Sequence, residues 1–226
     1  MTTVQLSPTY FGPIQWYQKL CRYDRVLIDC GVPFQKQSYQ NRCIIAGANG
    51  LQGLTVPVCS GGTVNGESRK VDTERHETRE EGRRERGERG RMISEHGNWR
   101  HVHWQALCSA YGDSPFFLYY ADDLRMFFEE HHWQSLFDLD MAVTGKICEL
   151  LDIRPNVEIL APSNRFTPGE DIDDLRLAIH PKHPRPDFSF TPKPYYQVFA
   201  RRHGFQPNLS ILDLLFNMGN ESVLYL

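Results

Sequence analysis

The sequence has no hydrophobic run long enough to cross a membrane. A transmembrane helix needs about 20 consecutive apolar residues, and no run in this chain of 226 residues approaches that length. The opening residues, MTTVQLSPTY, also lack the basic and apolar regions of a secretory signal. We therefore expect a soluble, cytoplasmic protein without stable membrane insertion.

A strong excess of either charge is absent as well. The 25 lysines and arginines nearly balance the 28 aspartates and glutamates, which leaves a formal net charge of -3. Such a chain generates no broad field that would attract nucleic acid. We therefore expect no nucleic-acid partner.

The motifs that bind metals and phosphates are also missing. The six cysteines contain no C-x-x-C pair, which predicts free thiols and no structural zinc site. Neither the G-x-G-x-x-G fingerprint nor the G-x-x-x-x-G-K-[ST] loop occurs. We therefore expect no metal site and no cofactor.

The first 60 residues do contain a pattern of strands and a helix. Residues 2–6 can form a short strand, residues 13–22 place apolar side chains at helical spacing, and residues 26–30 are typical of a buried strand. This order favours a right-handed crossover between two parallel strands. Residues 43–46 and 54–58 flank an Asn-Gly pair, which predicts a hairpin at an antiparallel edge of the sheet.

The rest of the chain is predicted to be mainly helical, with one further strand. Asn208 is placed to cap the last helix and Gly219 to end it. Together with the N-terminal pattern, this predicts a single α/β domain over residues 1–226, with a short mixed sheet packed by several helices. The helices are expected over residues 98–110, 115–130 and 133–151, at the start of segment 171–194 and over 210–218, and the strand over 156–160.

Residues 60–92 break this pattern. They are almost devoid of apolar side chains, and both charge signs are interleaved. Such a segment cannot bury enough apolar area to offset the entropy of ordering it. We expect a mobile charged insertion here, and a solvated loop rather than a nucleic-acid arm because the two signs nearly cancel.

His103 and Tyr111 are the candidates for catalysis. They lie eight residues apart on a predicted helix, so both side chains can share its inward face. A histidine in that position can act as a general base, because its unperturbed pKa lies near neutrality. The competing interpretation is a histidine that is simply hydrogen-bonded in the core.

A first group of binding residues is predicted just before the hairpin. Asn41 and Arg42 offer an amide and a fork of donors to a phosphate or carboxylate, and Gln37 lies nearby. The alternative, which the sequence leaves open, is that Arg42 pairs with Asp24 or Asp29.

A second group follows the predicted strands. Thr9 and Tyr10 come after the first strand, and Asp29 comes at the end of the next. Open α/β sheets bind ligands at this edge, and the amides at a helix N-terminus attract anions. These three residues are therefore binding candidates.

The last helix carries a polar stripe within an apolar sequence. Ser210, Asp213 and Asn217 recur at helical spacing. The stripe is either a solvent-exposed face, which is the commoner case, or an inward polar network. Asp213, and Asn208 just before the helix, are further binding candidates.

Several of these segments together resemble the WbqC-like family of bacterial proteins, which is found among genes for surface-polysaccharide assembly. The resemblance covers almost the whole chain except residues 60–92. The matching segments are YFGPIQWYQKL, DRVLIDC, QKQSYQNRCIIAGANGLQGLTVPV, HVHW, SAYGDSPFF, PYYQVF and HGFQPNLSILDLLFN.

The resemblance implies a transferase of O-antigen or other surface-polysaccharide biosynthesis that moves an aminoacyl group such as glycine to a sugar. In that role His103 would be the base, Arg42 would hold an anion, and Tyr10, Asn41 and Tyr111 would orient the substrate. The substrate would be a small molecule or a sugar, and the partners polysaccharide-assembly proteins. The alternative is a non-catalytic module that binds a nucleotide-sugar or a partner of the same pathway.

Overall fold

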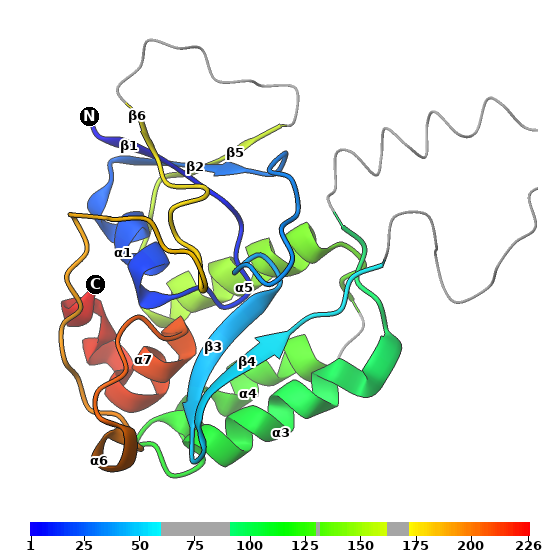
Figure 1. Cartoon of the computed structure of the whole chain (residues 1–226), viewed down its shortest axis with the longest axis vertical. Helices are drawn as coiled ribbons and strands as arrows, with labels where there is room; N and C mark the ends of the chain where they lie inside the picture. Colours follow the sequence, from blue (N-terminus) through cyan, green and yellow to red (C-terminus); the bar gives the residue numbers. More distant parts are fainter. Residues whose placement is uncertain (60–90, 130–131, 162–171) are drawn as a thin grey trace, which may run out of the picture.

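The computed structural model describes residues 1–59, 91–129, 132–161 and 172–226 (Figure 1). The predicted charged insertion at 60–92 lies outside these residues except at its C-terminal end. Val58 and Ile93, which flank this segment, form an antiparallel bridge. The chain therefore leaves and re-enters the described structure at adjoining points.

A parallel sheet forms around the predicted strand, helix and strand. Its strands lie in the order β5-β2-β1-β6, and each neighbouring pair is parallel. The helix α1 (Ile14–Arg22) connects β1 to β2, as predicted. The α/β class is thereby confirmed. The strands are β1 (Thr3–Leu6), β2 (Arg25–Asp29), β5 (Val157–Leu160) and β6 (Ile172–Asp174).

The predicted hairpin consists of β3 (Arg42–Gly47) and β4 (Gly50–Thr55). Gly47 pairs with Gly50, which has a positive φ of +105° that residues with a side chain rarely adopt. The hairpin forms a two-stranded sheet of its own rather than an antiparallel edge of the parallel sheet. The edge strands of the described parallel sheet are β5 and β6.

Three of the predicted helices are present as α3 (Trp99–Tyr111), α4 (Phe117–Glu129) and α5 (Leu136–Leu150). A 3-10 turn, η1 (His96–Asn98), precedes α3. Helix α3 packs across β3, and α4 contacts α3, α5 and α7 (Ile211–Met218). These contacts bury the apolar faces of the helices in one core with β1, β2 and the hairpin (Figure 1).

The expected short helix at the start of segment 171–194 is wrong for the described residues from 172 onward. Residues 172–174 pair with β1 as the strand β6, and the Leu175 amide continues the ladder by donating to the Gln5 carbonyl. The open side of β1 supplies hydrogen-bond partners for the backbone of these residues when it is extended. Tertiary pairing therefore overrides the local pattern.

The last helix differs from its prediction in two ways. Its N-cap is Ser210, whose hydroxyl accepts from the Leu212 amide, while Asn208 caps α1 by accepting from the Gln15 amide. The polar stripe is also inward, since Asp213 and Asn217 are both buried. A short helix, α6 (Ala200–His203), precedes α7, and a 3-10 segment, η2 (Gly219–Tyr225), follows it.

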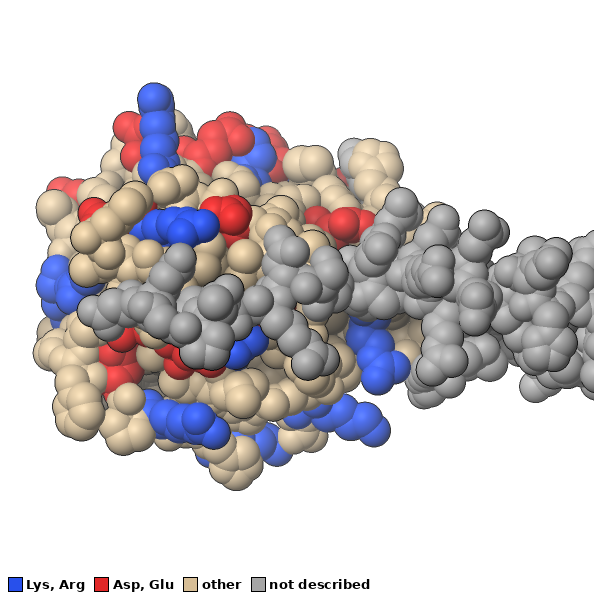
Figure 2. Space-filling view, turned by 90° about the horizontal axis from the view of Figure 1, so that it is seen from above, with Lys and Arg blue, Asp and Glu red and all other residues tan. Residues whose placement is uncertain are grey.

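Among the described residues, no helix combines the length and the apolar character that a membrane span requires. All six cysteines are free thiols. On the face shown in Figure 2, acidic and basic side chains lie close together instead of forming one broad patch of either sign. This distribution agrees with the small net charge of the chain.

Candidate functional site

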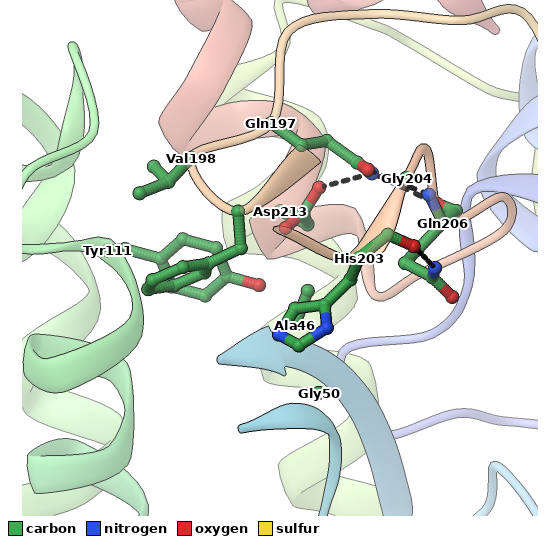
Figure 3. A pocket seen from close by; sticks show the side chains of 10 residues that line it. Ala46, Gly50, Tyr111, Gln197, Val198, His203, Gly204, Gln206 and Asp213 are labelled. Carbon is green, nitrogen blue, oxygen red and sulfur yellow. Dashed lines mark hydrogen bonds between the residues drawn. The ribbon is translucent and has the colours of Figure 1, made fainter. Parts of the chain in front are cut away.

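A pocket lies between the turn of the hairpin, the end of α3 and the start of α7 (Figure 3). Its volume is about 300 Å³, including space open to solvent. We call it the Asp213 pocket. It is lined by Ala46, Gly50, Tyr111, Gln197, Val198, Phe199, His203, Gly204, Gln206 and Asp213.

Asp213 is the main ionisable group of this pocket. Its Oδ2 accepts hydrogen bonds from the Tyr195 hydroxyl at 2.6 Å and from Gln197 Nε2 at 3.1 Å. Burial raises the pKa of the Asp213 carboxyl to about 6, although both hydrogen bonds act in the opposite direction. A carboxyl with this pKa can both take up and release a proton near neutrality.

Tyr111 and His203 face Asp213 across the pocket (Figure 3). Burial and the Asp213 charge raise the pKa of Tyr111 well above its usual value, so its hydroxyl stays protonated. His203 Nε2 lies 3.0 Å from the Ala48 carbonyl oxygen, which can only accept, so Nε2 carries a proton. The pocket thus combines a carboxyl, a phenol and an imidazole.

Local hydrogen bonds explain why these groups meet. The Ser210 amide donates to the Ile44 carbonyl, and the Ile211 amide donates to the Gly12 carbonyl, which fixes the start of α7 against β3. Gln197 closes the loop that contains α6, since its side chain donates to the Gln206 carbonyl and accepts from the Gln206 amide. Asp213 in the first turn of α7 is therefore held beside the loop.

Sequence reasoning predicted Tyr111 and Asp213 but did not bring them together, and it missed Tyr195 and Gln197. The last two lie in the segment PYYQVF, two residues apart, in a stretch outside the helices and strands. No periodicity in that stretch pointed to them, and only the fold reveals that both donate to Asp213.

His103 lies in the interior, away from the Asp213 pocket lining. It is 3% exposed, and its Nδ1 is 3.0 Å from the Tyr10 hydroxyl. Burial lowers the pKa of His103 to about 4, so the ring is neutral at physiological pH. The structure therefore brings the predicted residues His103 and Tyr10 together. They form a buried hydrogen-bonded pair between helix α3 and the loop after β1.

The predicted residues near the hairpin do not form one cluster. Asn41 is buried and its amide donates to the Val56 carbonyl, while Arg42 Nε donates to the Thr55 hydroxyl at 2.8 Å. Arg42 thus has a partner other than the two aspartates weighed for it. Gln37 is exposed, in a backbone conformation with φ of 63°.

The remaining predicted residues lie at the carboxyl ends of strands or at helix ends. Asp29 Oδ2 is paired with Arg176 Nη1 at 2.6 Å, and Thr9 lines a second pocket beside it in the fold. Asn208 is tied to α1 through Gln15, which its side chain both accepts from and donates to. In the described part of the chain, no group of three side chains is arranged to hold a metal ion.

Comparison with known proteins places the chain in a family. It is similar to the uncharacterized protein Rv1507c of Mycobacterium tuberculosis (strain ATCC 25618 / H37Rv), with 25% identity over 256 aligned residues that cover 100% of this chain and 98% of the relative. No solved structure matches the chain. The model of the WbqC-like protein family matches residues 7–171. Because that match spans well over half of the sequence, the chain belongs to the WbqC-like protein family.

Proposed function

We propose that this protein is a transferase of bacterial O-antigen or other surface-polysaccharide biosynthesis, which moves an aminoacyl group such as glycyl to a sugar. Membership of the WbqC-like family supports the pathway. The observation that carries the chemistry is Asp213, a buried carboxyl with a pKa near 6 that lines a pocket with a phenol and an imidazole.

In this proposal Asp213 is the general base. It takes the proton from an amine or hydroxyl of the acceptor sugar, whose nitrogen or oxygen then bonds to the carbonyl carbon of an activated aminoacyl donor. The bond from that carbon to the donor's leaving group breaks, and the leaving group departs with the proton. Tyr111, whose hydroxyl stays protonated, donates a hydrogen bond to the substrate.

Asp213 is a better base than His103, which the sequence first indicates. His103 does not line the Asp213 pocket, and one of its ring nitrogens is engaged with Tyr10. Its lowered pKa of about 4 makes it a weak proton acceptor at neutral pH. In the proposed reaction His103 supports the loop that carries Tyr10 rather than touching the acceptor.

The test uses a panel of nucleotide-sugars as acceptors, with glycine plus ATP, glycyl-tRNA or acyl-CoA as donors. Mass spectrometry reports any acceptor that gains the mass of the transferred group. Asp213→Asn should lower the rate about 100-fold or more, which is the usual contribution of a general base. The matched control is Asp138→Asn, because Asp138 is exposed on α5 and away from the pocket.

Two outcomes contradict this proposal. Turnover that is equal in Asp213→Asn and wild-type protein removes Asp213 as the base. A nucleotide-sugar that raises the melting temperature but returns chemically unchanged with every donor favours the alternative, a non-catalytic binding module, because ligand binding stabilises the native state without any reaction.

A further inference from the structure

A second pocket lies at the carboxyl ends of the parallel strands, apart from the Asp213 pocket lining. It has a volume of about 340 Å³, including open space, and we call it the strand-edge pocket. Its walls come from residues 7–9 after β1, residues 175–180 after β6 and residues 32–40 after β2. Strand β1 has β2, the next strand along the chain, on one side and β6 on its other side. Open α/β sheets bind ligands where connections diverge in this way.

The Thr9 side chain gives independent evidence for a ligand. Thr9 lines the strand-edge pocket and is 3% exposed, yet its Oγ1 has no hydrogen-bond partner among the described residues. A buried hydroxyl without a partner destabilises the folded protein. The Thr9 hydroxyl packs closely against Gly12, because a Cβ added at Gly12 would lie only 2.3 Å from Thr9 Oγ1. A ligand group that reached Oγ1 from the pocket would supply the missing partner.

The charges around the strand-edge pocket do not suit an anion. Arg176 is the charged residue of its lining, and all three guanidinium nitrogens are engaged. Nε and Nη2 bind Asp174, and Nη1 binds Asp29, so two carboxylates surround one cation. A phosphate or carboxylate would meet this excess of negative charge. This differs from the expectation that the loop after the first strand attracts anions.

The other polar groups of the lining are neutral. His180 Nδ1 accepts from the backbone amides of Lys182 and His183, which leaves Nε2–H as a donor. Burial also lowers the pKa of His180, which favours the uncharged ring. The lining also contains the hydroxyl residues Ser7, Ser38 and Tyr39 and the amide residues Gln35 and Gln40.

Aromatic and aliphatic surfaces lie beside these neutral donors and acceptors. Trp16 and Tyr39 form part of the wall, together with Leu175 and Ile179. A sugar ring has the matching character, with hydroxyls around its edge and C–H groups on its faces, and no charge. We infer that the strand-edge pocket binds an uncharged sugar unit of a glycan. This site is independent of the transfer reaction proposed above.

The probes for the test are the methyl glycosides of glucose, galactose and N-acetylglucosamine, with uridine and inorganic phosphate as competitors of other classes. Saturation-transfer NMR on the full-length protein detects binding with a Kd on the order of 1 mM. At least one glycoside should bind. Thr9→Val should weaken that binding about 10-fold or more, because the variant keeps the shape and removes the hydroxyl.

Two further variants make the result specific. Leu177→Trp fills the rim of the pocket at a side chain that is 43% exposed, so it leaves the core intact and should also abolish binding. Asp138→Asn, a substitution on the surface of α5 outside both pocket linings, should leave glycoside binding unchanged. The inference is overturned if no glycoside binds, if Thr9→Val and Leu177→Trp bind as wild type does, or if uridine or phosphate binds in place of the glycosides.

Discussion

At the scale of single residues, the Asp213 carboxyl shows how burial and hydrogen bonding oppose each other. Burial favours the protonated form and raises the pKa, while the hydrogen bonds from Tyr195 and Gln197 favour the carboxylate and limit the rise to about 6. Each donor therefore sets the pH at which Asp213 can act as a base. This makes Tyr195 a positioning residue with a measurable role.

Replacing Tyr195 with Phe should raise the pKa of Asp213, because the variant loses the 2.6 Å hydrogen bond to the carboxylate. A rise of about one unit corresponds to about 1.4 kcal/mol. The ring contacts of Tyr195 with Phe205 and Tyr225 should persist in the variant. The measurement is the carboxyl carbon shift of Asp213 against pH by NMR.

Tyr196→Phe is the control for that measurement, since Tyr196 is the neighbouring tyrosine, is 56% exposed and makes no hydrogen bond to Asp213 among the described residues. It should leave the titration of Asp213 unchanged. An unaltered midpoint in Tyr195→Phe would show that the hydrogen bond has no influence on the carboxyl, and Tyr195 would then serve packing alone.

At the scale of elements, helix α1 is anchored by an ion pair that spans the sequence. Lys19 Nζ lies 2.6 Å from Asp187 Oδ2, and the two side chains are 0% and 6% exposed. Asp187 also accepts from Gln15 Nε2, one turn earlier on α1, and its pKa is lowered to about 2 despite the opposing effect of burial. The segment around Asp187 is thereby fixed along α1.

Replacing Lys19 with Met should lower the free energy of unfolding by about 3–5 kcal/mol, because it leaves a buried carboxylate without its cation. The double variant Lys19→Met/Asp187→Leu should lose less than either single variant, since no buried charge remains. Urea unfolding at pH 7 measures all three. Arg125→Met is the control, because Arg125 and Glu129 are about half exposed and such pairs contribute about 0–1 kcal/mol. Equal losses in the buried and exposed variants would contradict the prediction.

The elements also show what the sequence can and cannot predict. Strand β2, helix α1 and the hairpin follow from local periodicity and an Asn-Gly turn, and all are present. Strand β6 has no such signal, because its structure depends on the free edge of β1, more than 160 residues earlier in the chain. Gln5 of β1, for example, pairs with Asp174 of β6.

In the candidate site, likewise, the sequence indicated some of the residues but not the contacts between them. Residue type indicated Asp213 and Tyr111, since a carboxyl and a phenol on apolar helices call for partners. Their meeting depends on the contact of α7 with β3, and the same contact turns the polar stripe inward. Asn208 shows the limit most clearly, because it caps a helix, but α1 rather than the helix that follows it.

At the scale of the whole molecule, Asp213 and His103 give opposite contributions to the pH dependence of stability. Asp213 has a raised pKa of about 6, so its contribution is present below its unfolded pKa of about 3.9 and is lost as pH rises through 6. His103 has a lowered pKa of about 4, so its contribution is present above its unfolded pKa of about 6.5 and is lost as pH falls through 4. Each amounts to about 3 kcal/mol.

The two contributions therefore oppose each other between about pH 4 and pH 6.5, and single variants should separate them. The stability of Asp213→Asn relative to wild type should rise with pH over this window, by up to about 3 kcal/mol. The relative stability of His103→Gln should fall by a similar amount. Subtracting wild type cancels other titrating groups, including Asp140, whose pKa burial also raises. Urea unfolding at several pH values measures these differences, and a difference curve that stays flat would show that the group replaced in that variant keeps an ordinary pKa in the folded protein.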